Sequence, residues 1–126
     1  MTNRVTNYIK GRTKAFKHAF NGINILFTEE PNSKIQAVLA IVALIMGYLL
    51  HISSTEWIII CIVIGLVFAM EAINSAIENL ADFTCNKKFE ESIKKTKDLS
   101  AAAVLFSAIA ALIAGLIIFL PKLLSL

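Results

Sequence analysis

The sequence predicts an all-α membrane protein with three transmembrane helices and an N-terminal amphipathic surface helix. Apolar residues make up 57% of the chain, and the mean hydropathy is +0.73. A soluble fold of 126 residues could not bury that much apolar surface in one small core. The apolar residues also form three separate blocks with polar flanks, so we expect one integral-membrane domain spanning residues 1–126.

The N-terminal segment carries a helical stripe of apolar residues. The spacings along it are seven, four, three and four residues, and the stripe consists of Ile9, Phe16, Phe20, Ile23 and Phe27. A helix over about residues 6–28 would lie in the membrane interface, with its cations near anionic head groups. It should end shortly before Pro31, because proline disfavours helical geometry in the preceding residue. The alternative is a basic flank without a helix.

Three apolar blocks predict the membrane spans, and they are residues 35–50, 57–70 and 99–120. A bilayer core of about 30 Å needs roughly 20 helical residues, which the first and third blocks supply once their flanks are included. The second block covers only about 21 Å and must continue into the polar stretch that follows it. The expected spans are about 33–51, 56–80 and 98–120.

Lysine and arginine predict the orientation of these spans. Residues 1–34 carry six of these cations and the loop 83–98 carries five, whereas residues 51–56 carry none and the tail after residue 120 carries one. The positive-inside rule therefore places the N-terminus in the cytoplasm and the C-terminus outside. The first 34 residues contain no apolar region typical of a signal peptide. No nucleic-acid motif accompanies the cations, so we expect no nucleic-acid partner.

Polar residues follow the second apolar block in what should be the same helix. At about 100° per residue, Glu71, Asn74, Glu78 and Asp82 fall within a sector of roughly 80°. A charged carboxylate at the centre of a membrane helix costs about 2.5–3.5 kcal/mol, so such residues usually face a bundle interior and mark a site or a pathway. The alternative is a hydrogen-bonded clamp between helices.

The chemistry of this face suits a hard cation and phosphate. Glu30, Lys97 and Asp98 should lie at the same cytoplasmic level as Glu78. Mg²⁺ commonly binds one or two carboxylates together with substrate phosphates, and a lysine can offset phosphate charge. These residues indicate metal-dependent chemistry at the inner membrane surface. A small proton- or cation-coupled transporter subunit using the same acids is the alternative.

Three motifs stand out in the sequence, and they are "EAINSAIENLAD" at residues 71–82, "KDLSAAAVL" at 97–105 and "EPNSK" at 30–34. They resemble, in that order, the signature, the second block and the element before the first span of the bacterial integral-membrane diacylglycerol kinase family, which includes undecaprenol kinases. The resemblance covers nearly the whole chain. It implies a lipid kinase of the bacterial cytoplasmic membrane that uses MgATP to phosphorylate diacylglycerol or undecaprenol.

The resemblance also implies roles for individual residues. Glu71 would be the general base at the lipid hydroxyl, Glu30 and Glu78 would hold the Mg²⁺ that bridges the ATP phosphates, and Lys97 would neutralise phosphate charge.

Asn74, Asp82 and Asp98 complete the ATP-binding set that the resemblance implies. Asp98 would help bind the nucleotide, Asn74 would support the phosphates or the base, and Asp82 would orient neighbouring groups. The family forms homotrimers with active sites between protomers. Small residues at every fourth position of the third span would suit close packing in such a trimer, and they are Ala103, Ser107, Ala111 and Gly115.

Overall fold

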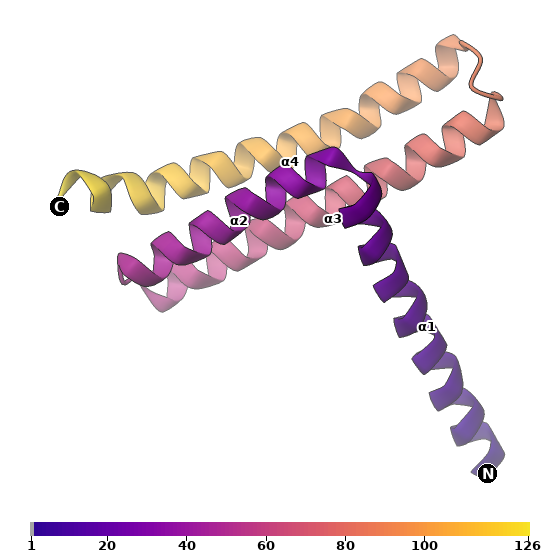
Figure 1. Cartoon of the computed structure of the whole chain (residues 1–126), viewed down its shortest axis with the longest axis horizontal. Coiled ribbons are helices and arrows are strands. Elements are labelled where there is room, and N and C mark those ends of the chain that lie inside the picture. Colours follow the sequence, from indigo (N-terminus) through magenta and orange to yellow (C-terminus); the bar gives the residue numbers. More distant parts are fainter. Residues whose placement is uncertain (1) are drawn as a thin grey trace.

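Four helices make up the computed structural model, which describes residues 2–126. They are α1 (Thr2–Glu29), α2 (Pro31–Leu49), α3 (Ser54–Thr84) and α4 (Glu91–Leu124). Helices α2, α3 and α4 run side by side, and α1 leaves them at a steep angle (Figure 1). Each of the three packed helices is long and apolar enough to cross a membrane. The predicted all-α class with three spans is confirmed.

The corner between α1 and α2 is fixed by a proline and a buried serine. Pro31 is the first residue of α2, and the residue before it, Glu30, has extended backbone angles (φ −101°, ψ 110°). The Ser33 side chain is fully buried, and its Oγ lies 2.6 Å from the carbonyl oxygen of Leu26 and 2.7 Å from that of Glu30. A hydroxyl that bonds the last turn of α1 and the first turn of α2 holds the direction of the chain where Glu30 enters the bundle.

A tight turn joins α2 and α3 at the other end of the bundle. Ser53 caps α3 in a capping box with Glu56, because each side chain bonds the other residue's backbone N–H. Gly47 lies against Trp57 so closely that a Cβ there would be 2.8 Å from the indole ring. The small buried core packs beside this turn and consists of Ile52, Ile60, Ile118 and Phe119.

Two ion pairs fix the register of α3 against α4. Lys97 Nζ lies 2.8 Å from Asp82 at one end, and Lys122 Nζ lies 3.3 Å from Glu56 at the other. The residue numbers add to 179 in the first pair and to 178 in the second, so the two antiparallel helices keep one register along their length. The polar ends of both helices extend past the beginning of α2 (Figure 1).

Candidate active site

Glu71 is the most deeply buried charged residue of α3. Its side chain is 1% exposed, and Gln36 of α2 donates a hydrogen bond from Nε2 to Glu71 Oε2 at 3.0 Å. Helix α2 carries Gln36 one and a half turns past its start, where the antiparallel pairing with α3 brings the two side chains together. A buried carboxylate needs donors of this kind, and this one is presented between helices rather than to acyl chains.

Glu30 contacts α3 at the next turn toward the C-terminal end of that helix. Ser75 donates a hydrogen bond from Oγ to Glu30 Oε1 at 2.6 Å. Ser75 and Glu78 are three residues apart, so their side chains are neighbours on one face of α3. The hydrogen bond therefore brings the Glu30 carboxylate to the part of α3 that carries Glu78.

Asn74 supports Glu78 from the turn below it. Asn74 Nδ2 donates to Glu78 Oε1 over 3.4 Å, a long hydrogen bond, and the Asn74 side chain is 8% exposed. The other polar atom of the Asn74 side chain, Oδ1, is buried and has no hydrogen-bond donor among the described residues. Each of the carboxylates Glu71, Glu30 and Glu78 thus receives one hydrogen bond from a neutral side chain.

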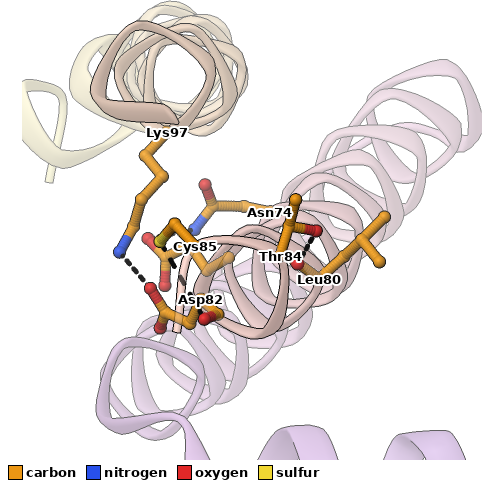
Figure 2. Close-up of polar contacts among 7 residues, drawn as sticks. Asn74, Leu80, Asp82, Thr84, Cys85 and Lys97 are labelled. Atoms are coloured by element: carbon orange, nitrogen blue, oxygen red, sulfur yellow. Dashed lines mark hydrogen bonds and ion pairs between the residues drawn. The ribbon is translucent and has the colours of Figure 1, made fainter. Parts of the chain in front are cut away.

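Lys97 reaches from α4 to the last turns of α3. Its Nζ lies 2.8 Å from Asp82 Oδ1, and Figure 2 shows the two side chains pointing toward each other across the helix pair. The hydrogen bond from Lys97 to Asp82 raises the pKa of the lysine, and the nearby Glu78 charge acts in the same direction. Lys97 precedes the apolar run that begins at Leu99, so it stands at the polar end of α4 as a fixed positive charge.

Asp98 lies apart from these groups within one chain. Its carboxylate pairs with Lys94 one turn earlier on α4, at 2.6 Å, and the two side chains are 65% and 61% exposed. Glu71, Asn74 and Glu78 thus lie along α3. Ser75 brings Glu30 to the same part of that helix, and Asp82 binds Lys97 of α4. Asp98 lies on an exposed surface of α4.

The geometry fits a cation held in part by phosphates. Among residues 2–126 no group of three or more histidine, cysteine or acidic side chains is arranged to hold a metal ion. The Glu30 carboxylate nevertheless binds Ser75, which lies within one turn of Glu78 on α3. Mg²⁺ takes one or two protein carboxylates and completes its shell with water and phosphate oxygens, so this donor set is compatible with it.

Comparison with known proteins identifies the family. The model of the prokaryotic diacylglycerol kinase family matches residues 17–119. The chain belongs to the prokaryotic diacylglycerol kinase family. It is therefore a lipid kinase, and the predicted family and enzyme class are confirmed. Three helices long and apolar enough to cross a membrane, together with this family, indicate a multi-pass membrane protein.

Relatives within this diacylglycerol kinase family carry two kinds of name. An undecaprenol kinase of Bacillus subtilis (strain 168) is 41% identical over 110 residues, which cover 87% of this chain and 89% of the relative. A diacylglycerol kinase of Synechocystis (strain PCC 6803) is 33% identical, covering 89% of this chain and 64% of the relative. One from Helicobacter pylori (strain 26695) is 31% identical, covering 79% and 80%.

Two side chains of this diacylglycerol kinase family member were not predicted from the sequence. Gln36 on α2 donates a hydrogen bond to Glu71 on α3, and Ser75 on α3 donates one to Glu30 at the start of α2. In each pair the two residues are far apart in the sequence. Ser75 lies inside the signature block, and Gln36 is the one polar residue of the first apolar block. These two positions in the sequence could have marked both residues as candidates. Their hydrogen-bond partners could not be predicted, because they depend on the register between helices.

Proposed function

We propose that this kinase transfers the γ-phosphoryl group of MgATP to the hydroxyl of a membrane lipid alcohol at the cytoplasmic face of the bacterial inner membrane. The observation that carries the proposal is the placement of Glu71. It is buried directly after the apolar run of α3 and is oriented by Gln36. Polar side chains continue from it along α3 to Asp82, which binds Lys97. A buried acid beneath a cationic, carboxylate-lined entrance suits a reaction between a lipid hydroxyl and a soluble nucleotide.

In this mechanism Glu71 acts as general base. It accepts the proton of the lipid hydroxyl, the alcohol oxygen bonds to the γ-phosphorus, and the bond from that phosphorus to the ADP oxygen breaks. Lys97 offsets the charge that develops on the phosphate oxygens. Glu30 and Glu78 would hold Mg²⁺, which when bound supplies further charge neutralisation across the ATP phosphates.

The remaining polar residues have supporting roles. Asn74 keeps Glu78 oriented through its side-chain amide, and Asp82 holds Lys97 at the entrance. Asp98, on the open surface of α4, would bind nucleotide in an assembly where a second protomer closes the site. We propose a homotrimer, with α1 lying along the membrane surface. Most large apolar residues of α1 are exposed within one chain, and only Leu26 is buried, which supports contact with lipid or with neighbouring protomers.

Both lipid alcohols named by the relatives fit this chemistry, because each presents a primary hydroxyl near the interface. The undecaprenol kinase shares the higher identity of the relatives reported above. Undecaprenol is therefore the acceptor we place first, with diacylglycerol second.

The test is phosphorylation in mixed micelles. Purified protein, Mg²⁺ and ATP labelled on the γ-phosphate should transfer label to undecaprenol or diacylglycerol. Glu78→Gln should abolish transfer, whereas Glu91→Gln, at an exposed carboxylate at the start of α4, should leave it intact. Absence of labelled lipid with either alcohol, or full activity in Glu78→Gln, would contradict the proposal.

A further inference from the structure

An apolar groove runs between α2 and α4, with α3 as its floor. Its volume is 440 Å³, within the range of ligand pockets. Leu39 and Met46 line the α2 side, Phe68 the floor, and Ala111 and Gly115 the α4 side. Gln36, at the cytoplasmic end, is the one uncharged polar side chain among the lining residues, and no charged residue lines the groove.

Gln36 connects this groove to the candidate base. Its Nε2 donates to Glu71, while its Oε1 is buried and has no donor among the described residues. Buried acceptors in native proteins almost always have a partner, so an open one at the mouth of a cavity indicates a missing donor. The missing donor has to lie beside Glu71, because Gln36 Oε1 belongs to the same amide group as the Nε2 that binds Glu71.

The groove is long enough for an extended chain. From Gln36 to Met46 it follows ten residues of α2, or about 15 Å. The register of α3 and α4 places Ala108 at the level of Glu71, and Gly115 is seven residues, about 10 Å, farther from the base. A Cβ added at Gly115 would meet no atom within 4 Å, so the groove is open at that depth.

We propose, on the basis of the proposed function, that this groove holds one hydrocarbon chain of the lipid alcohol and that Gln36 Oε1 accepts the hydrogen bond of its hydroxyl before catalysis. The hydroxyl then gives its proton to Glu71 while its oxygen attacks the phosphorus, and Gln36 is unchanged. Lipid tails are as apolar as the groove, so filling the groove provides little selectivity by itself. Selection comes from the hydroxyl, the one donor that such an alcohol offers to the open acceptor.

The first experiment replaces the amide with an apolar side chain of the same length. Gln36→Met should lower kcat and raise KM for the lipid, for a loss of about tenfold or more in kcat/KM, while KM for MgATP stays unchanged. That fold-change is the effect of leaving a hydrogen-bonded donor without its partner. Ile41→Met, on an exposed face of α2 outside the groove, is the matched control and should behave like wild type. An unchanged lipid KM and kcat in Gln36→Met, or an equal rise in KM for MgATP, would overturn the role.

The second experiment blocks the groove beyond the reach of a short chain. Gly115→Leu should reduce kcat/KM for dioleoylglycerol at least tenfold and spare dibutyroylglycerol, whose chains end before that depth. Ala110→Leu, on an exposed face of α4 outside the groove, should spare both lipids. Since leucine is a better helix former than glycine, a loss in Gly115→Leu cannot come from helix propensity.

The outcomes separate this inference from the function on which it rests. Equal effects of Gly115→Leu on both lipids, or no effect on either, would overturn the groove as a tail site. Loss of the oligomer in Gly115→Leu, seen by size-exclusion chromatography, would assign the groove to a second copy of the chain and overturn it also. A wild-type protein that phosphorylates no lipid alcohol would overturn the proposed function itself, and this inference with it.

Discussion

Ser75 offers a sharp perturbation of the candidate metal site without a change in charge. Ser75→Ala removes the hydroxyl that donates to Glu30 Oε1 at 2.6 Å and leaves α3 otherwise intact. A hydrogen bond to a charged group contributes about 1.5–3 kcal/mol, and loss of a partner that orients a metal ligand typically weakens metal binding by about 10–100-fold. Both side chains are only half-buried, so we expect the lower part of that range, about tenfold.

The assay measures metal binding and nucleotide kinetics separately. Mn²⁺ affinity in the presence of a non-hydrolysable ATP analogue, read by electron paramagnetic resonance, should fall about tenfold in Ser75→Ala, and KM for MgATP should rise in parallel. Ser75→Thr keeps the hydroxyl and should restore both. Ser107→Ala is the matched control, because that buried hydroxyl bonds the Val104 carbonyl of its own helix. If Ser75→Ala and Ser107→Ala gave the same Mn²⁺ affinity, the positioning of Glu30 by Ser75 would be refuted.

Two further predictions separate the entrance of the site from the packing at the far end. Lys97→Met should raise KM for MgATP by about tenfold or more, because the site loses a positive charge beside the phosphates. Initial rates at varied MgATP concentrations measure this KM. An unchanged KM would be incompatible with phosphate binding by this lysine. Gly47→Ala should lower the melting temperature in detergent, because its Cβ would lie 2.8 Å from the Trp57 ring and overpacking typically costs about 1–3 kcal/mol. Gly65→Ala meets nothing within 4 Å and gains the same helix propensity, about 1 kcal/mol, so it should melt at or above the wild-type temperature. A Gly47→Ala protein as stable as Gly65→Ala would contradict the close contact.

Helices were predictable because hydropathy and backbone chemistry act locally. Pro31 was expected to end the surface helix, and α1 stops at Glu29; Pro31 is also the first residue of α2, two residues before the expected start of the first span. The polar residues after the second apolar block continue its helix, and α3 carries them to Thr84. Helix α4 begins earlier and ends later than its apolar run, since charged residues extend its beginning and the helix continues through Pro121, which removes one backbone hydrogen bond without ending it.

Contacts between helices were less predictable because they depend on register. The polar face of α3 predicts that Glu71, Asn74 and Glu78 share a site, but nothing local tells that Gln36 reaches the first of them. That contact joins residues 35 positions apart. The sequence also does not tell which oppositely charged residue a side chain will pair with when several lie at a similar height along the helices. Lys97 pairs with Asp82, whereas the neighbouring Asp98 points to its own helix.

A structure of the assembled protein with Mg²⁺ and a non-hydrolysable ATP analogue would test the proposed site most directly. We predict a metal ion about 2.1 Å from carboxylate oxygens of both Glu30 and Glu78, with the terminal phosphate on the side that faces Glu71. A nucleotide bound away from α3, or a metal ion that neither carboxylate touches, would contradict the account.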